Sequence, residues 1–532
     1  MNLNKLTNSQ VESISTDILR EWCLDVLLIH PPAHPNPKVK SPGISLFDAD
    51  TGYSQQFVSI STGLINIASN LEKEGFRIKI LNLAEIAYYL ANNFKLQEWI
   101  EPLNVPIVGI SLQWSVHSWG SIEIVKLINK LHPKTLIYYG GLTASLFYRD
   151  ILEFPSIRVD GVMVGEADIS FVDVVKSVLH EKDIDNIPGL YKKDKKGYIN
   201  DTLKPIPPDL LNLDFSRYDL IYPNIFYSER GNVTILRGCK YDCSYCGAGK
   251  KAYQKCMQHR GERFLSPKEL IRQLKLLEKI GKTRLYLYGD FRIFGEKYRQ
   301  EFLDYAKNAD IKCRVVVEFF TPGNEKYIDF LQSAFPKLEA TLSPESGNEK
   351  IREKVYKRYS NKELIRHCEI VSERQIPQST YFMMCLPMQG PAEVQSDFSI
   401  MEQLLDIYLK NNRYNDLNHD IIPYTLLQYP DPGSVIFQQP EKFGYTLLIK
   451  SFNDLVQSLK SQTWQDIIGY KTSWFPDRKI IVETFVSVCR KRALLYYERG
   501  IINENEYKLH IHNIEKDISN LKVINANLRT SW

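Results

Sequence analysis

The chain has 532 residues, of which 44% are hydrophobic and 24% are charged, as is typical of a globular protein of about two to four domains. Its 67 basic and 63 acidic residues leave a net charge of +4, which lacks the basic excess of a nucleic-acid-binding surface. No apolar run of about 18 residues predicts a membrane span, and the polar N-terminal stretch lacks a signal-peptide core. Since the nine cysteines also show no disulfide framework, we expect a cytoplasmic protein.

The first third of the chain alternates strands with helices. After a short helix within residues 1–24, apolar runs predict strands at 25–30, 77–83, 105–112, 135–139 and 161–164. Helical spacing of apolar residues predicts helices at 59–74, 84–98, 121–131 and 171–179, and residues 33–57 are expected to form a long loop. This order predicts a doubly wound parallel sheet that binds ligands at the carboxyl ends of its strands.

Candidate ligand contacts therefore lie where these strands end. Glycines there let a ligand approach the backbone closely. The candidates are Pro31, Pro32, Ser111, Leu112, Trp114, Ser115, Gly140, Gly141, Thr143, Gly165 and Glu166. A nucleotide-binding Rossmann unit is the alternative, but no G-x-G-x-x-G follows the first strand.

Three short patterns resemble the cobalamin-binding (B12-binding) domain that precedes many radical S-adenosylmethionine (SAM) enzymes. They are PP after the first strand, GG-x-T-A after the fourth and V-x-x-G-E-A-D after the fifth, followed by a stretch like the family's connecting hairpin. The resemblance implies that the strand-end residues contact cobalamin. The D-x-H-x-x-G motif that ligates cobalt in other cobalamin proteins is missing, so we interpret His30, His34 and His117 as loop residues. A domain that no longer binds cobalamin remains the alternative.

The next feature is a cysteine cluster. An apolar run at 233–236 predicts a strand, Arg237 and Gly238 end it, and Cys239, Cys243 and Cys246 follow as C-x3-C-x2-C. Three thiolates suit a four-iron cubane that usually has four cysteine ligands, and leave one iron open. A zinc site completed by Cys256, near Tyr253 and His259, and a group of buried free cysteines are the alternatives.

This loop resembles the cluster loop of the radical SAM superfamily, including its aromatic residue, here Tyr245. The resemblance implies a [4Fe-4S] cluster whose open iron holds SAM, from which one electron releases a 5′-deoxyadenosyl radical. Strands at 284–288, 313–319, 338–342, 379–386 and about 420–427, with helices at 266–280, 295–309, 324–334, 361–374 and 392–409, predict a partial barrel of six β-α units. The SAM contacts that the resemblance implies are Tyr245, Gly289, Asp290, Glu318, Ser343, Glu345 and Lys357.

Together these features predict an α/β chain with a B12-binding Rossmann-like domain, a partial (β/α)6 radical SAM barrel and a helical C-terminal domain. The expected boundaries are 1–24 for the N-terminal extension, 25–185 for the first domain, 186–228 for the linker, 229–438 for the barrel and 439–532 for the C-terminal domain.

The resemblance implies C-methylation of an unactivated carbon in a natural-product or peptide intermediate, with methylcobalamin as methyl donor. Cyclisation, rearrangement, polar methyl transfer, or a non-catalytic cobalamin and iron–sulfur binding role are the alternatives. We expect a monomer that binds a small-molecule or peptide substrate, takes an electron from flavodoxin or ferredoxin, and binds neither nucleic acid nor membrane.

Overall fold

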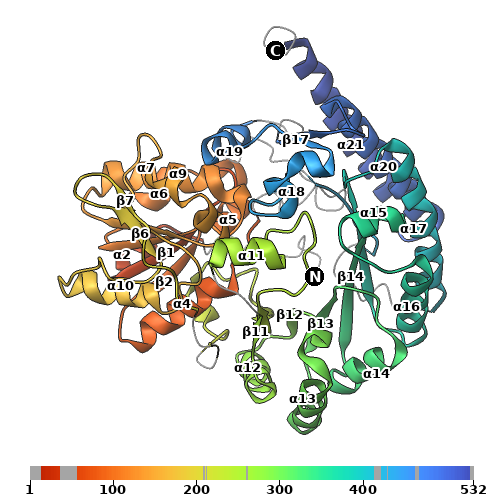
Figure 1. The fold of residues 1–532 in the computed structure, drawn as a ribbon, viewed down its shortest axis with the longest axis horizontal. Helices are drawn as coiled ribbons and strands as arrows, with labels where there is room; N and C mark the ends of the chain where they lie inside the picture. Colours follow the sequence, from red (N-terminus) through yellow and green to blue (C-terminus); the bar gives the residue numbers. More distant parts are fainter. Residues whose placement is uncertain are drawn as a thin grey trace.

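The computed structural model describes residues 14–35, 57–207, 210, 213–258, 262–411, 421–427, 429–461 and 467–527. Two α/β units lie side by side, with the helix α11 (Lys250–Met257) between them and the C-terminal helices beside the second unit (Figure 1). The predicted loop at 33–57 and the sixth barrel strand fall partly outside the described residues.

The first unit is built on a sheet of eight strands in the order β7-β6-β5-β4-β3-β1-β2-β8. Its parallel centre consists of β1 (Val26–His30), β2 (Ile78–Asn82), β3 (Ile107–Ser111), β4 (Leu136–Gly140) and β5 (Gly161–Met163). The hairpin β6 (Leu190–Lys193) and β7 (Ile199–Asn200) extends one edge antiparallel, and β8 (Ile221–Tyr222) extends the other. Every residue of β1 and β3 is buried, which explains their continuous apolar runs.

Helices cover both faces of this sheet, as the doubly wound prediction requires. Leu64 of α4 (Thr62–Lys73) and Phe171 of α10 (Ser170–Leu179) belong to a core that continues into the second unit. The other face packs against α5 (Leu83–Leu90), α6 (Leu96–Ile100), α7 (Ser118–Leu131) and α9 (Tyr148–Leu152). The predicted helix at 84–98 was wrong in one respect: it is broken at Ala91, whose φ of 44° is not helical.

The second unit is a six-stranded parallel sheet in the order β16-β15-β14-β13-β12-β9, which is the predicted partial barrel. Its strands are β9 (Arg230–Thr234), β12 (Arg284–Tyr288), β13 (Arg314–Phe319), β14 (Leu338–Glu345), β15 (Gln378–Met384) and β16 (Tyr424–Leu426). The intervening helices are α12 (Pro267–Lys279), α13 (Gly295–Ala309), α14 (Glu325–Ala334), α16 (Asn361–Glu373) and α17 (Pro391–Asn411).

The strand predicted at 233–236 was wrong in its bounds. β9 ends at Thr234, and β10 (Leu236–Arg237) leaves the barrel to pair antiparallel with β11 (Arg263–Phe264). The chain therefore turns out of the sheet before it reaches the cysteines.

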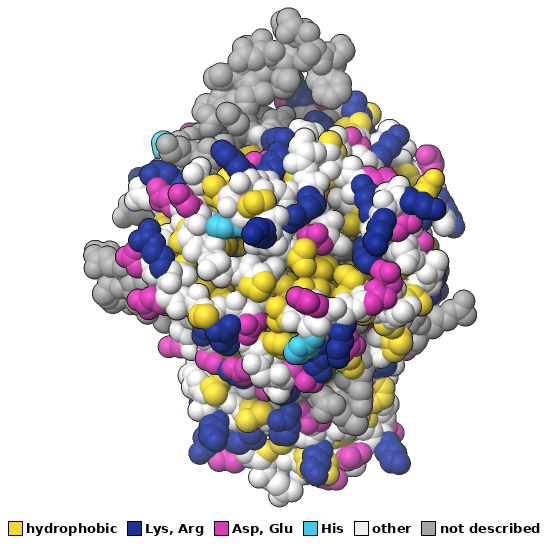
Figure 2. Space-filling view, turned by 90° about the vertical axis from the view of Figure 1, so that its left-hand side faces the viewer, with side chains coloured by type: hydrophobic (Ala, Val, Ile, Leu, Met, Phe, Trp, Pro, Cys, Tyr) yellow, Lys and Arg dark blue, Asp and Glu magenta, His cyan; other side chains and the backbone are white. Residues whose placement is uncertain are grey.

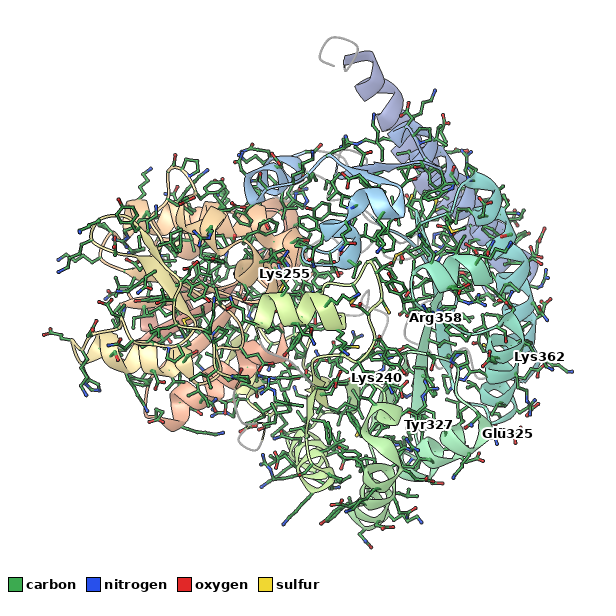
Figure 3. All side chains as sticks on the ribbon, viewed as in Figure 1. Lys240, Lys255, Glu325, Tyr327, Arg358 and Lys362 are labelled. Carbon is green, nitrogen blue, oxygen red and sulfur yellow. The ribbon has the colours of Figure 1, made fainter. Side chains whose placement is uncertain are left out.

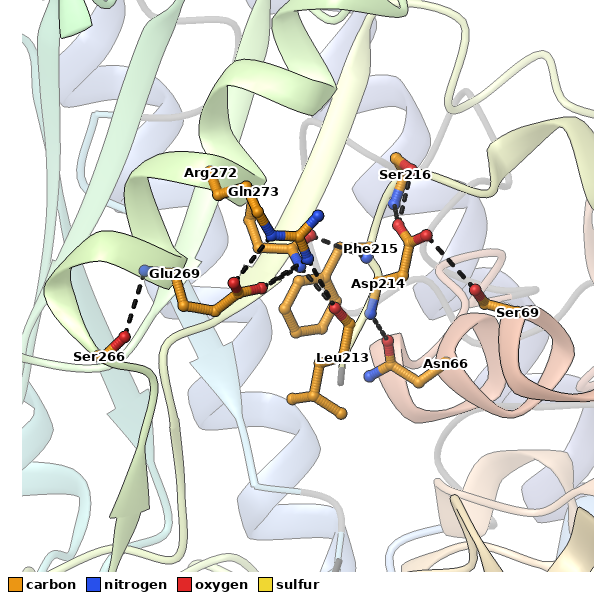
Figure 4. Close-up of polar contacts among 10 residues, drawn as sticks. All are labelled: Asn66, Ser69, Leu213, Asp214, Phe215, Ser216, Ser266, Glu269, Arg272 and Gln273. Carbon is orange, nitrogen blue, oxygen red and sulfur yellow. Dashed lines mark hydrogen bonds and ion pairs between the residues drawn. The ribbon is translucent and has the colours of Figure 1, made fainter. Parts of the chain in front are cut away.

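A linker segment joins the two units through paired polar contacts (Figure 4). The Asp214 N–H donates to Asn66 Oδ1 of α4 at 3.0 Å, and the Phe215 N–H donates to Gln273 Oε1 of α12 at 3.1 Å. Gln273 in turn donates to the carbonyl of Leu213 at 2.6 Å. Because helices of both units hold the same short stretch, the linker fixes their relative position.

The C-terminal region is mostly helical, with one exception that the sequence did not predict. β17 (Tyr445–Leu447) and β18 (Tyr470–Thr472) form a small antiparallel pair, after which α20 (Arg478–Glu498) and α21 (Glu504–Asn527) follow. Phe452 of α19 (Phe452–Leu459) packs against Phe147 of the first unit with ring centroids 5.8 Å apart. The Ile422 N–H, just before β16, donates to the Tyr496 hydroxyl of α20 at 2.9 Å, so the C-terminal region contacts both units.

The surface of the first unit carries both signs of charge. Figure 2 shows Lys and Arg side chains interspersed with Asp and Glu around an apolar patch, and neither sign dominates the described part of this face. In the part of the chain that the structure describes, no helix combines the length and the apolar character needed to cross a bilayer.

Candidate functional site

Hydrogen bonds of its backbone hold the cysteine loop, one within the loop and the others to two later segments of the chain. The Cys246 N–H donates to the Cys243 carbonyl at 3.1 Å and closes a turn. The Ser244 N–H donates to Val355 O at 3.4 Å, and Ser244 O accepts from the Ile436 N–H at 2.8 Å. The Gly247 N–H donates to Asp431 Oδ2 at 2.9 Å. The loop between β10 and α11 is therefore fixed by segments from the far side of the barrel mouth.

Cys239, Cys243 and Cys246 keep partly exposed side chains, whereas Cys256 is buried, and all four are free thiols. Burial raises the pKa of Cys239 to about 11 and also raises the pKa values of Cys243 and Cys246, with smaller contributions from neighbouring charged groups. A thiol must lose its proton to bind metal, so binding at this loop releases protons.

Cys256 does not join the three loop cysteines. It lies in α11, and its sulfur is 3.0 Å from the position that a Cβ on Gly433 would occupy. None of the three loop cysteines contributes to its raised pKa, which burial causes. Among the described residues no group of three or more His, Cys, Asp or Glu could hold a single metal ion. A cubane does not need such convergence, since each cysteine binds a different iron.

Tyr245, Glu345 and Lys357 form a buried chain of contacts at the barrel mouth. The Tyr245 hydroxyl donates to Glu345 Oε1 at 2.7 Å, and Lys357 Nζ donates to the same oxygen at 2.9 Å. Burial works against the Lys357 ammonium, but Glu345 and Cys243 outweigh it and raise the pKa of Lys357. No residue that the structure describes donates to Glu345 Oε2, so this oxygen can accept from a ligand hydroxyl. Ser343 lies two residues earlier on β14, and its carbonyl accepts from Lys357.

Glu345 also has an unusual backbone conformation. Its φ is 68°, which a non-glycine residue rarely adopts, and the register between β14 and β15 shifts between Leu342 and Glu345. Left-handed non-glycine residues concentrate at functional sites because the surrounding structure must hold them there.

The side chain of Asp290 binds protein groups, contrary to the expectation that it holds the amino group of SAM. Its side chain is fully buried and accepts from Arg292 at 2.5 Å, from the Tyr327 hydroxyl at 3.1 Å and from the Phe320 N–H at 3.2 Å. Figure 3 labels Tyr327, which lies in the first turn of α14. Both Asp290 oxygens are therefore engaged in joining the ends of β12 and β13.

The neighbouring Gly289 has a packing reason to be glycine. Its φ is 137°, and a Cβ would meet Leu236 Cδ2 at 2.6 Å and Ile235 Cγ1 at 2.7 Å. The end of β12 thereby approaches the segment that leads into the cysteine loop.

A cavity of about 300 Å³ lies where the two units meet. From the first unit it is lined by the predicted residues Ser111, Gly140, Gly141, Gly165 and Glu166. From the second unit it is lined by residues next to the first cysteine, namely Leu236, Arg237 and Gly238. The edge of the sheet where ligands are expected therefore adjoins the cysteine loop.

The structure does not bring the other predicted cobalamin contacts to this cavity. Leu112 is fully buried in the core, Thr143 donates to the Gln113 carbonyl at 3.0 Å, and Trp114 packs against Phe57 with ring centroids 4.7 Å apart. Pro31, Pro32 and Ser115 also lie outside the lining. Pro32 instead packs so closely against α7 that a Cβ on Gly120 would overlap its carbonyl oxygen.

Sequence reasoning missed the lining residues that other elements supply. Thr62 and Gly63 start α4, and the Thr62 hydroxyl hydrogen bonds Thr234 Oγ1 of β9 at 2.6 Å. Gln113 follows the predicted Ser111–Leu112 pair and accepts from the Leu142 N–H at 3.2 Å. Gly63 could have been predicted from the sequence, because a glycine in the first turn of a helix that starts at the ligand-binding edge lets a ligand approach closely.

Arg237 of the second unit forms a bidentate ion pair with Asp168 of the first unit at the cavity. Its two Nη atoms donate to the two carboxylate oxygens of Asp168, both at 2.7 Å, and it lies 3.7 Å from Glu166. Glu166 also accepts from Tyr253 and Arg263. A bidentate pair of this kind fixes geometry as well as charge, so the loop after β5 positions the entry to the cysteine loop.

Comparison with known families gives the same division of the chain. Residues 233–399 match the family model of the radical SAM superfamily, and residues 56–175 match that of the B12 binding domain. The chain contains a radical SAM domain and a B12-binding domain. The two domains imply a [4Fe-4S] cluster, SAM and cobalamin as cofactors.

Two solved structures share the fold of this chain. The radical SAM methyltransferase TsrM from Kitasatospora setae, with cobalamin and a [4Fe-4S] cluster bound, is 15% identical, covers 80% of this chain and 77% of its own, and has a TM-score of 0.54. The cobalamin-dependent SAM radical enzyme OxsB, with aqua-cobalamin and SAM bound, is 14% identical, covers 93% and 71%, and has a TM-score of 0.57.

Two curated relatives match over a smaller part of the chain. The hopanoid C-3 methylase of Methylococcus capsulatus is 21% identical over 230 residues, which are 43% of this chain and 42% of that protein. An uncharacterised protein of Methanocaldococcus jannaschii is 22% identical over 324 residues, 60% of this chain and 66% of that protein. The chain thus spans between 42% and 66% of the length of these two relatives.

The residues present fit these cofactors. Three partly exposed free thiols suit a cluster with three protein ligands. The unengaged Glu345 Oε2, beside the Lys357 ammonium, suits a hydroxyl-bearing and carboxylate-bearing ligand. The cavity suits a ligand that approaches backbone: nothing lies within 4 Å of where a Cβ of Gly63 would stand, and the φ of Gly141 is 109°.

Proposed function

We propose that this enzyme methylates an unactivated carbon of a natural-product or peptide intermediate. When bound, SAM and the cluster supply a 5′-deoxyadenosyl radical that removes a hydrogen atom, and methylcobalamin, which a second SAM regenerates after reduction, supplies the methyl group. The hopanoid C-3 methylase and TsrM, both named for methyl transfer, support this choice among the reactions of radical SAM enzymes.

The observation that carries the proposal is the shared cavity. Gly140, Gly141 and Gly165 reach it from the B12-binding domain, and Gly238, which precedes Cys239, reaches it from the barrel. A methyl donor and a radical can act on one substrate carbon if their sites open into the same space. The Arg237–Asp168 pair holds the two sides in register.

Each group of residues has a separate task in this proposal. Cys239, Cys243 and Cys246 hold the cluster. Glu345 accepts from the SAM ribose, Lys357 pairs with the SAM carboxylate and Tyr245 packs near the adenine. The cavity residues Ser111, Gly140, Gly141, Gly165 and Glu166, with Gln113 and Gly63, hold cobalamin. Burial of these contacts excludes water from the reacting atoms.

Labelled SAM tests the proposal. The anaerobically reconstituted enzyme, with SAM carrying a ¹³C-methyl group, methylcobalamin and a reductant, should release 5′-deoxyadenosine and transfer the label to carbon in a candidate substrate. Release of 5′-deoxyadenosine with a rearranged, unlabelled product would support cyclisation or rearrangement instead. Label transfer without 5′-deoxyadenosine would support polar methyl transfer.

The proposal extends to partners and compartment. All nine cysteines are free thiols, which suits the reducing cytoplasm that an exposed cluster requires. We expect a monomer that accepts its electron from a carrier such as flavodoxin or ferredoxin. Gel filtration and reduction of the cluster by flavodoxin hydroquinone are the corresponding measurements.

A further inference from the structure

Glu318 stands out among the charged side chains of the barrel because it has no counter-charge of its own. It makes no hydrogen bond or ion pair with any residue that the structure describes. The charges around it are paired: Lys357 with Glu345 at 2.9 Å, and Arg292 with Asp290 at 2.5 Å. Arg314, at the opposite end of β13, lies 3.5 Å from Glu339, which Arg284 also contacts. The half-buried Glu318 carboxyl group therefore has no directly paired cation among the described residues.

Strand register places Glu318 on the inner face of the barrel. Val315, Val317 and Phe319 belong to the core under the helices, so the alternate residue Glu318 points inward. β13 pairs Glu318 with Thr341 of β14 and Leu287 of β12 with Val317, which sets Tyr288 beside Glu318.

Two tyrosine rings flank this carboxylate. Tyr286 and Tyr288 have ring centroids 4.7 Å apart, and the Tyr286 hydroxyl reaches Thr341 Oγ1 at 3.3 Å across β13. Tyr288 is 40% exposed, although it points into the barrel. Burial and then the Glu318 charge raise the pKa of both phenols, which fixes the three groups as neighbours. Accessible aromatic faces beside a lone carboxylate are the elements of a cation site.

The site lies near the groups assigned to SAM, since Lys357 and Glu345 both act on the pKa of Glu318. Glu318 comes from β13, whereas Glu345 comes from β14, after the register shift that follows Leu342. Burial raises the pKa of Glu318 to about 7, partly offset by Lys357, so a bound cation is needed to favour its ionised form fully.

We propose that Glu318, Tyr286 and Tyr288 form a cation-binding subsite that receives a protonated amine of the substrate. The proposal rests on the proposed function in one respect: it takes the barrel interior as the place where the substrate binds. It replaces the expectation that Glu318 contacts SAM, and it narrows the substrate class to compounds that carry a positively charged nitrogen.

Benzylammonium and benzyl alcohol, which have nearly the same shape, separate the contribution of charge. Binding is measured by saturation-transfer NMR on anaerobically reconstituted full-length protein with SAM and no reductant, so that no turnover occurs. We expect the wild type to prefer benzylammonium by at least about tenfold, and Glu318→Gln to reduce the ratio to within about twofold. Glu325→Gln, which removes an exposed carboxylate from α14, should keep the full preference.

Two further variants test the aromatic part. Tyr288→Phe keeps the ring and should keep the preference, whereas Tyr288→Leu should reduce it by about threefold. A Glu318→Gln protein that still prefers benzylammonium tenfold, or a Tyr288→Leu protein with undiminished preference, would overturn the proposal.

Titration with SAM identifies the source of the cation. If Glu318→Gln weakens SAM binding tenfold and leaves the benzylammonium preference intact, the carboxylate serves SAM and the substrate proposal is wrong. Release of 5′-deoxyadenosine by the wild type is measured separately, so a failure of the radical function is distinguishable from a failure of this subsite.

Discussion

The ammonium of Lys357 lies between the Glu345 carboxylate and the Cys243 thiol, and only 8% of its side chain is exposed. Buried pairs of this kind contribute little relative to an apolar replacement of both partners, but removal of one partner leaves a charge in a medium that cannot hydrate it. Replacing Lys357 or Glu345 alone should therefore destabilise the protein more than replacing both.

Lys357→Met should destabilise the cofactor-free chain by about 3–5 kcal/mol, because Glu345 then stays buried without a cation. The double variant Lys357→Met/Glu345→Gln should recover most of that loss. Lys350→Met, on the exposed face of α15 (Glu349–Lys354), should change stability by less than about 0.5 kcal/mol. The measurement is the denaturant midpoint, and equal losses in the single and double variants would refute the pairing argument.

Individual residues also show where prediction from sequence stops. The three cluster cysteines lie within eight positions, so their spacing alone indicates the site. Arg237 and Asp168 are 69 positions apart, and no local pattern links them before the two units pack together. Asp290 was misassigned for the same reason: its partners Tyr327 and Phe320 come from other β-α units.

At the scale of elements, two glycines in separate helices have opposite surroundings. Gly120 lies in α7, where a Cβ would overlap the carbonyl oxygen of Pro32 after β1. Gly63 lies in the first turn of α4, where a Cβ would have nothing within 4 Å of it. The first glycine permits close helix packing and the second opens the cavity.

Alanine at these two positions should therefore act in opposite directions. Gly120→Ala should lower the free energy of unfolding by about 1–3 kcal/mol, since the backbone of Pro32 or of α7 must shift. Gly63→Ala should raise it by up to about 1 kcal/mol through helix propensity alone. Thermal unfolding of the two purified variants decides this, and a stabilised Gly120→Ala protein would contradict the packing.

Elements were predictable where their patterns are long. The strand at 284–288 and the helix at 295–309 have the predicted bounds, because their alternating and helical spacings are undisturbed. The strands of the β17–β18 pair have three residues each, too few to establish a period. α8 (Leu142–Leu146) and α11 were also missed, since each begins within a loop interpreted only for its ligand contacts.

For the whole molecule, contacts between the units matter more than any one domain. Glu85 of α5 is fully buried, and its carboxylate accepts from the Phe226 N–H at 2.5 Å and from Asn82 at 3.2 Å. Phe226 belongs to the segment that leads into the barrel. Burial raises the pKa of Glu85 to about 8, although these hydrogen bonds act in the opposite direction.

The raised pKa of Glu85 makes stability depend on pH. Between its ordinary pKa of 4.5 and the folded value of about 8, the folded chain keeps a proton that the unfolded chain has lost. This stabilisation is complete below pH 4.5 and is lost as pH rises through 8. The advantage of Glu85→Gln over wild type should accordingly grow by a few kcal/mol from about pH 5 to about pH 8, at about 1.4 kcal/mol per unit. A difference that does not change with pH would show that Glu85 ionises freely in the folded protein.

The account depends most on a cluster with three protein ligands and one open iron. Its direct test is the electron paramagnetic resonance spectrum of the reduced, anaerobically reconstituted enzyme, recorded with and without SAM. We predict that SAM changes the spectrum of the wild type and of Cys256→Ser alike, and that Cys243→Ser retains no intact cluster. A spectrum that SAM leaves unchanged, or a Cys256→Ser protein that loses its iron, would contradict the account.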